Sequence, residues 1–197
     1  MKTPIALIPF HDWRKIMLEG FRTRDAHFIE EFSKEKDRIK IIINRPTTIA
    51  EILVKRKMGL IRGKIILAKN SFKLYEIEHN VYLIDFVSLD ILGQIKQNYS
   101  WFFKKYNAAA YITFIHEVFQ YLNVANEICL FSQNIFAVDL FKSINAKTKI
   151  FDAWDNFNKF HVYSSVKTII YQAYKTLGNS ADYWTTNSTD NLEDFNR

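Results

Sequence analysis

The sequence has 197 residues, of which 48% are hydrophobic, 16% aromatic and 24% charged. This apolar content suits one folded domain and excludes a globally disordered, collagen-like or low-complexity chain. The formal net charge at pH 7 is +6, and five Gly and a single Cys disfavour glycine-rich phosphate loops and exclude a disulfide framework within the chain. No window approaches the ~18 uninterrupted apolar residues of a membrane span, and we expect a reducing compartment.

The first part of the chain predicts a strand, a polar loop and a helix. The apolar run at residues 5–9 is typical of a short buried strand. After Gly20, four apolar side chains, Phe21, Phe28, Ile29 and Phe32, fall on one helical face and predict the first helix. Residues 39–44 are rich in β-branched side chains and predict a second strand, which Pro46 ends.

A cationic segment follows between Ile52 and Tyr75. It contains seven basic residues and no acid, namely Lys55, Arg56, Lys57, Arg62, Lys64, Lys69 and Lys73. Within it, residues 64–68 and 72–77 predict a β-hairpin at a sheet edge. The charge is either an ordinary solvated surface or a patch that attracts anionic lipid headgroups or a phosphorylated partner.

The remaining chain continues to alternate between strand and helix patterns. A regular helix is expected where Leu92, Ile95, Tyr99, Phe102 and Tyr106 form a stripe that we expect to be a buried packing face. The other predicted elements are strands at 81–86, 127–131, 149–152 and 182–186, and helices at 111–122, 134–144 and 162–177, the last ended by Gly178.

This alternation predicts an α/β fold, a Rossmann-like three-layer domain with a mainly parallel six-stranded sheet plus a β-hairpin insertion. Residues 1–197 are expected to form that single domain, and the start of a helix pattern after residue 187 suggests that more protein follows. No nicotinamide fingerprint, P-loop, G-x-S-x-G elbow, paired-cysteine zinc site or H-E-x-x-H occurs, so the corresponding enzymes lose support and no metal site is predicted.

A dense polar loop follows the first strand and leads into the first helix. It would lie at the carboxyl edge of the sheet, where ligands bind in α/β folds, and the helix N-terminus favours anions. The candidate substrate-binding residues of this loop are His11, Asp12, Gly20, Arg22, Arg24 and His27. Asp25, in the first helical turn, is a candidate catalytic acid or base. The alternative is structural: Asp25 caps the helix and His27 packs against it.

A second polar segment, residues 151–157, follows the fifth strand at the same edge. Asp152 is a candidate substrate-binding residue, and Asp155 is a candidate catalytic base that could take a proton from an attacking hydroxyl. The alternative is that both acids cap the next turn and helix. His161, near the start of the next predicted helix, is a weaker candidate for this site. If the two polar segments serve one cleft, Arg24 and Asp155 must lie at one rim of the sheet.

Four segments, 19–27, 44–51 with Asn44-Arg45-Pro46 and Ala50-Glu51, 151–157 and 180–188, together resemble the N-terminal half of bacterial GT-B glycosyltransferases of the glycosyltransferase-4-like superfamily. The resemblance implies an acceptor-side domain that faces a second, donor-binding domain absent from this chain. It implies metal-independent transfer of a sugar from a nucleotide-sugar to a hydroxyl of a polysaccharide or lipid-linked acceptor, without a cofactor. Gly20, Arg22 and Arg24 would then lie near the donor diphosphate or the acceptor, with Asp155 or Asp25 as the base.

The resemblance further implies that this chain alone is inactive and that the enzyme is cytoplasmic. A position at the inner face of the membrane, with Lys55, Arg56 and Lys57 binding peripherally to lipid, is a further hypothesis from the charge. One rival reading is a non-catalytic Rossmann-like binding module that works with a separate partner. A nucleic-acid binder ranks lower, because most aromatic residues fall in helical packing stripes and no recognition motif accompanies the charge.

Overall fold

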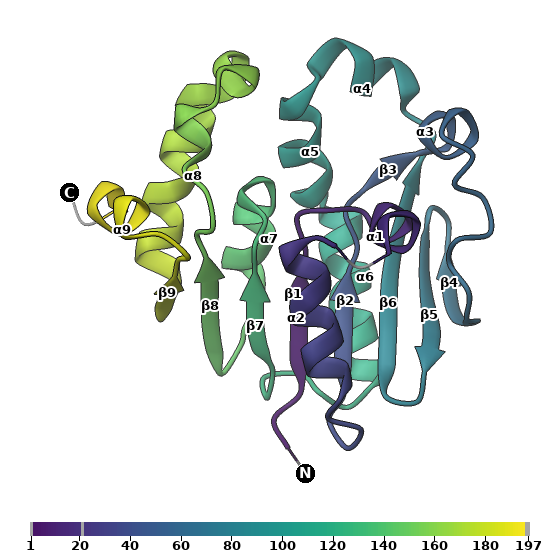
Figure 1. Ribbon diagram of the computed structural model, residues 1–197. Coiled ribbons are helices and arrows are strands. Elements are labelled where there is room, and N and C mark those ends of the chain that lie inside the picture. Colours follow the sequence, from purple (N-terminus) through teal and green to yellow (C-terminus); the bar gives the residue numbers. More distant parts are fainter. Residues whose placement is uncertain (1, 21, 196–197) are drawn as a thin grey trace.

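The computed structural model describes residues 2–20 and 22–195. They form an α/β domain around a mixed sheet of nine strands (Figure 1). The strands are β1 Ile5–Ile8, β2 Lys40–Ile43, β3 Thr47–Thr48, β4 Lys64–Lys69, β5 Phe72–Glu78, β6 Val81–Ser88, β7 Cys129–Ser132, β8 Thr148–Asp152 and β9 Tyr183–Thr185. Their order is β4-β5-β6-β2-β1-β7-β8-β9, and the short β3 pairs with the end of β6.

Most of the sheet is parallel. Neighbouring strands from β6 through β2, β1, β7 and β8 to β9 all pair in parallel, an order that matches a doubly wound Rossmann sheet. The β4–β5 hairpin extends this sheet by antiparallel pairing of β5 with β6, and β4 forms the edge. The predicted hairpin and its edge position are therefore confirmed. The two-residue β3 was not predicted.

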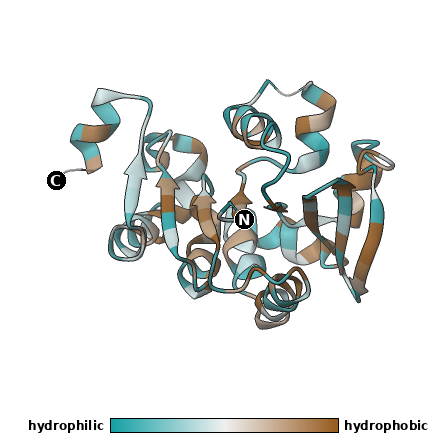
Figure 2. Cartoon of the chain, turned by 90° about the horizontal axis from the view of Figure 1, so that it is seen from below, coloured by the Kyte–Doolittle hydropathy of each residue, from teal (hydrophilic) through white to brown (hydrophobic). Residues whose placement is uncertain are grey.

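Helices cover both faces of the sheet (Figure 2). The α-helices are α1 Trp13–Glu19, α2 Arg24–Ser33, α3 Ile49–Val54, α4 Ile91–Gln97, α5 Tyr99–Tyr106, α6 Ala109–Tyr121, α7 Val138–Ser143, α8 Lys167–Ser180 and α9 Thr189–Phe195. Short 3-10 turns occupy Ile135–Ala137, Phe157–Lys159 and His161–Val166.

Side-chain alternation along β1 divides the hydrophobic core in two. Ala6 and Ile8 belong to the larger cluster, which α5, α6, α7 and α8 complete. Ile5 and Leu7 point to the opposite face and pack with residues of α1 and α2. The period of two along a strand explains this division, and burial on both faces explains why β1 is apolar throughout.

The helix predicted through Leu92 and Tyr106 is two helices. Asn98 separates α4 from α5 with φ 47° and ψ −123°, a conformation that cannot continue a helix. Leu92 and Ile95 are 70% and 71% exposed, so the predicted packing face is wrong for α4, whereas Tyr106 in α5 is fully buried. The predicted stop at Gly178 is also wrong, because α8 continues to Ser180.

Candidate functional site

The candidate site is a crevice at the carboxyl edge of the sheet, between the ends of β1 and β7. In a doubly wound sheet, the chain turns to opposite faces from these two central strands, which leaves a crevice at their carboxyl ends. A cavity of about 200 Å³ opens there. Its lining residues are Phe10, His11, Thr23, Arg24, Asp25, Gln133 and Trp154. The site therefore combines the first polar loop with residues that follow β7 and β8.

Helix α1 shapes the first polar loop, which sequence analysis treated as irregular. Asp12 caps its N-terminus by accepting a hydrogen bond from the Arg14 backbone N–H. The helix ends at Gly20, where φ is 65°, a left-handed conformation that favours glycine. Thr23 then precedes α2, which places Arg24 and Asp25 in its first turn. Gly20 thus has a structural role at the helix end, and it does not line the cavity.

His11 and Asp25 form a hydrogen-bonded pair in the crevice. The backbone N–H of His11 donates to Asp25 Oδ2 over 2.7 Å, and His11 Nδ1 lies 3.1 Å from the same oxygen. An ionised carboxylate only accepts hydrogen bonds, so in the neutral imidazole the pairing favours the proton on Nδ1 and the lone pair on Nε2. No described residue forms a hydrogen bond with Nε2. The imidazole is thereby oriented as a proton acceptor.

The environment of Asp25 keeps its carboxylate ionised. Burial acts to raise the pKa of Asp25, but the hydrogen bonds from the His11 side chain and backbone, together with the charge of His11 whenever its ring is protonated, outweigh it, and the pKa is lowered. The Asp25 carboxylate also accepts a hydrogen bond from the Ala26 backbone N–H over 3.1 Å. A buried carboxylate with this many donors is a weak base. Its position suits it to orient His11.

Arg24 and Asp152 bring the two predicted polar segments together. Arg24 Nε and Nη2 donate to the two Asp152 oxygens over 2.8 and 2.9 Å, a bidentate pair. The Asp152 hydrogen bond raises the pKa of Arg24. Asp152 is fully buried and also accepts from Gln133 Nε2 and Thr185 Oγ1, each over 2.7 Å. The predicted meeting of these loops is confirmed. Asp152 joins them, and both of its carboxylate oxygens accept hydrogen bonds from the protein.

The other predicted site residues lie around this centre or away from it. Asp155 is half-buried next to Trp154 but does not line the cavity, and burial raises the pKa of its carboxyl. Arg22 and His27 are exposed. His27 Nδ1 lies 4.0 Å from Glu30 on the same helix. The structure does not bring Arg22 or His27 into the crevice: Arg22 precedes α2 and is exposed, and His27 lies on the solvent-facing side of α2.

Asp12 belongs to a buried polar network that sequence analysis missed. Arg14 Nη1 donates to Asp85 Oδ1 over 3.0 Å and to Asp12 Oδ1 over 3.2 Å. Asn44 Nδ2 donates to the same two oxygens, and Lys57 Nζ donates to Asp12 Oδ2 over 3.2 Å. All five residues are buried, and their formal charges cancel. We call this set the buried network.

One sequence signal could have indicated this network. Asp85 stands alone in the otherwise apolar centre of β6, and a buried carboxylate needs a partner. Burial lowers the pKa of Arg14, but its interactions with Asp85 and Asp12 outweigh burial, and the pKa is raised. Lys57 is removed from the exposed cationic surface by the same contacts. The predicted lipid contact at Lys57 is therefore wrong, because its ammonium points into the protein.

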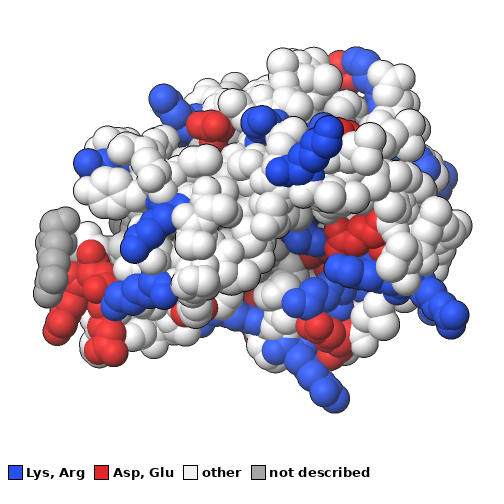
Figure 3. Space-filling model, turned by 90° about the horizontal axis from the view of Figure 1, so that it is seen from above, with Lys and Arg blue, Asp and Glu red and all other residues white. Residues whose placement is uncertain are grey.

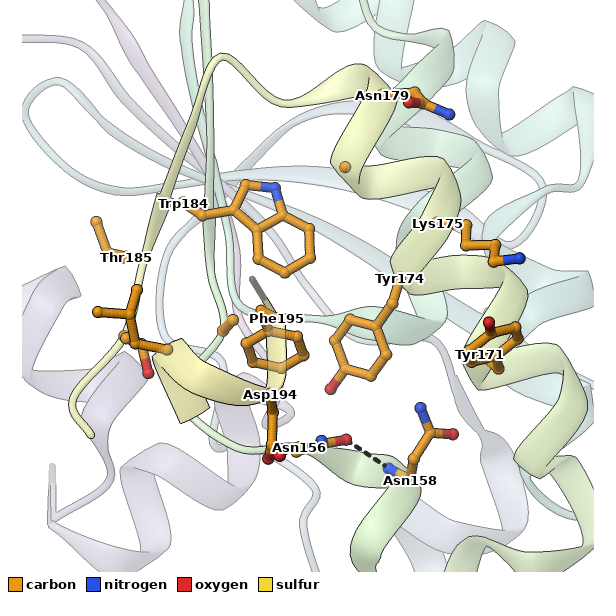
Figure 4. Close-up of a pocket in the computed structure, with 14 residues that line it drawn as sticks. Asn156, Asn158, Tyr171, Tyr174, Lys175, Asn179, Trp184, Thr185, Asp194 and Phe195 are labelled. Carbon is orange, nitrogen blue, oxygen red and sulfur yellow. Dashed lines mark hydrogen bonds between the residues drawn. The ribbon is translucent and has the colours of Figure 1, made fainter. Parts of the chain in front are cut away.

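A larger cavity, of about 710 Å³, lies between α8, β9 and α9 (Figure 4). Tyr174, Trp184 and Phe195 pack together on one side of it, with ring centroids 4.9–6.2 Å apart. Asn158 also lines this cavity, and its backbone N–H donates to Asn156 Oδ1 over 3.2 Å. None of the predicted catalytic or substrate-binding residues lines this cavity.

In comparisons with known proteins, no protein-family model, no curated protein and no solved structure matches the chain. Within residues 2–20 and 22–195, no helix is long and apolar enough to cross a bilayer. In the same described part of the chain, no three His, Cys, Asp or Glu side chains come together as a group that could hold a metal ion.

Proposed function

We propose that this chain is the acceptor-side domain of a GT-B glycosyltransferase that transfers a sugar from a nucleotide-sugar to a hydroxyl of a polysaccharide or lipid-linked acceptor. The observation that carries the proposal is the oriented His11–Asp25 pair in the crevice between β1 and β7. Two of the four segments that carry the resemblance, 19–27 and 151–157, meet at this crevice through Arg24 and Asp152.

His11 is the base in this proposal. The acceptor oxygen attacks the anomeric carbon while the bond to the leaving diphosphate breaks, and the electron pair of that bond leaves with the diphosphate. His11 Nε2 takes the hydroxyl proton, and the ionised Asp25 stabilises the imidazolium that forms. Asp25 thus acts through His11. Asp155 stays the second candidate base, since burial raises its pKa and so its proton affinity.

The size of the crevice supports a two-domain active site. Its volume of about 200 Å³ is below the ~300–1,000 Å³ of pockets that enclose a drug-sized ligand. In this proposal a second domain supplies the donor site, the reaction needs no metal or cofactor, and the enzyme works in the cytoplasm at the inner membrane face. The order of the six parallel strands, with helices on both faces, supports the finer description of a Rossmann-like three-layer domain with a hairpin insertion.

One observation favours the alternative of a non-catalytic module. Arg24, predicted to bind an anion, is engaged by the buried Asp152 through two of its nitrogens. A module that kept the fold and used this ion pair only for stability would show the same geometry. Such a protein would bind its partner without sugar transfer.

The test is sugar transfer by the complete enzyme that carries this domain, with donor binding measured separately. We expect His11→Asn to lower kcat by about 10²–10⁴-fold without weakening donor binding, because the loss is that of a general base. His27→Asn is the matched control, since His27 is exposed and outside the crevice. Normal turnover in both His11→Asn and Asp155→Asn would refute the proposed mechanism. No transfer from any nucleotide-sugar would favour the non-catalytic module.

A further inference from the structure

Helices α3 and α4, with their flanking residues, carry an unusual group of exposed aliphatic side chains. Their exposed fractions run from 55% to 82%. The six residues are Leu53, Val54, Met58, Leu89, Leu92 and Ile95. We call this surface the α3–α4 rim. Single exposed apolar residues are ordinary, but six from two adjacent elements form a patch that needs an explanation.

Hydrogen bonds hold the two halves of the rim together. Gln94, in α4, accepts a hydrogen bond from Thr48 Oγ1 over 2.8 Å at the start of α3 and donates to Glu51 within α3 over 3.4 Å. Figure 1 shows α3 and α4 side by side beyond the carboxyl ends of the strands. No residue of α4 is buried. The break at Asn98 lets α5 enter the core while α4 keeps its apolar side chains outside.

Basic side chains accompany the aliphatic ones. Lys55, Arg56 and Lys96 are all exposed, and the view onto the carboxyl edge shows Lys and Arg side chains spread among uncharged surface (Figure 3). Arg56 and Lys96 form no ion pair with any described residue. The acids of the rim are neutralised: Glu51 pairs with Lys55 over 3.1 Å, and Asp90 pairs with Lys105 over 2.9 Å. The rim therefore has a positive excess.

We propose that the α3–α4 rim binds an anionic lipid surface, with its aliphatic side chains entering the acyl boundary and its basic side chains at the headgroups. Peripheral helices that bind membranes combine these two features. A protein partner fits less well, because protein interfaces concentrate Tyr, Trp and Phe, and the six apolar residues of the rim include no aromatic one. The surface differs from the predicted one: Lys55 and Arg56 remain, Lys57 is excluded, and α4 is added.

This proposal does not depend on the proposed sugar transfer. It is tested by flotation of the full chain with vesicles of phosphatidylcholine, with and without an equal share of phosphatidylglycerol, at low and high salt. We expect binding to the anionic vesicles at low salt only. Leu92→Ser with Ile95→Ser should weaken this binding about tenfold or more, because two aliphatic side chains that enter the lipid are replaced by small polar ones. Arg56→Gln with Lys96→Gln should weaken it about fivefold per charge at low salt.

Matched controls separate a specific rim from general stickiness. Leu192→Ser removes another exposed aliphatic side chain, from α9, and Lys73→Gln with Lys167→Gln removes two exposed charges elsewhere. These variants should bind as the unsubstituted chain does. The proposal is overturned if the chain stays with the vesicle-free fraction at low salt, or if the controls weaken binding as much as the rim variants. It is also overturned if Leu92→Ser with Ile95→Ser instead abolishes self-association measured by sedimentation. That result would show that the rim binds a second copy of the chain.

Discussion

Two polar clusters occupy the same carboxyl edge of the sheet, and they use similar residues for different ends. The buried network joins Arg14 to Asp85 and Asp12, whereas the crevice joins Arg24 to Asp152 and His11 to Asp25. In the network every charged side chain is buried and paired. In the crevice His11 and Arg24 are partly exposed and line a cavity.

Two consecutive residues belong to the two different clusters. His11 extends to α2 and the crevice, while Asp12, the next residue, caps α1 and enters the network. Burial and complete pairing make the network a support, since a ligand would find no free group there. Partial exposure, with Nε2 of His11 unpaired by any described residue, makes the crevice the candidate for the proposed chemistry. The role of an Arg–Asp pair in this protein thus depends on its burial and on its other hydrogen bonds, and not on the residue types alone.

The largest expected effect comes from breaking the buried network. Arg14→Met should lower the free energy of unfolding by about 3–5 kcal/mol, because it leaves the buried carboxylates of Asp12 and Asp85 with too few donors. Urea unfolding measures this change. Adding Asp85→Leu to Arg14→Met should recover part of the loss, since one uncompensated charge is then removed. A loss below about 1 kcal/mol for Arg14→Met would show that the network is not a support.

A smaller effect is expected at the border of the network, at Glu51. Burial alone would raise the pKa of Glu51, but the charges of Arg45, Lys55 and Lys57 outweigh it and lower the pKa to about 2. This pKa lies below that of the unfolded chain, so the carboxylate contributes stability above about pH 4.5 and loses it as the pH falls towards 2. Glu51→Gln should cost about 2–3 kcal/mol at neutral pH.

The pH dependence provides the check on Glu51. Between pH 4.5 and 2, the unsubstituted chain should lose more stability than Glu51→Gln, so that the two unfolding curves converge at low pH. Glu31→Gln is a suitable control, because Glu31 is exposed on α2 and its ion pair among the described residues is with the exposed Lys34. Curves that stay parallel for Glu51→Gln would contradict the lowered pKa.

Breaking the Arg24–Asp152 ion pair in the crevice should lower stability less than breaking the buried network. Arg24→Gln should lower the free energy of unfolding by about 1–2 kcal/mol, because Arg24 is partly exposed and Asp152 keeps the hydrogen bonds of Gln133 and Thr185. Thermal and urea unfolding both report this difference. Equal losses in the free energy of unfolding for Arg24→Gln and Arg14→Met would contradict the difference inferred between the Arg24–Asp152 pair and the buried network.

Much of the fold could be predicted from the sequence because strand and helix periods differ. The runs at 5–9, 39–44 and 81–86 are apolar on both strand faces, as central parallel strands must be. The break between α4 and α5 could not be predicted, because the apolar spacing continues from Ile95 to Tyr99 and only the backbone conformation of Asn98 ends the helix. Likewise, nothing in the sequence distinguishes the buried Lys57 from its exposed neighbours.

The site was predicted in outline only. Chain order places the loops after β1 and β8 at one sheet edge, so the proximity of Arg24 to Asp152 follows from topology. The pairing of His11 with Asp25 depends on how α1 folds back over the intervening residues, which no local pattern specifies. Side-chain partners that lie far apart in sequence are fixed by packing. The sequence therefore predicted that the two polar segments meet better than it predicted their side-chain contacts.

The smallest effect on stability, and the sharpest test of the crevice, is expected at His11. His11→Asn should change the free energy of unfolding by less than about 1 kcal/mol, because the ring is at the rim of the cavity and only its Nδ1 is paired. The informative measurement is the tautomer of the neutral imidazole, read from its ¹⁵N shifts. We expect the proton on Nδ1 in the unsubstituted chain and a shift towards the distribution of the exposed His27 in Asp25→Ala. A neutral His11 with its proton on Nε2 would leave no lone pair on that nitrogen for the proposed proton transfer, and His11 would then be excluded as the base while the fold and the buried network stayed unchanged.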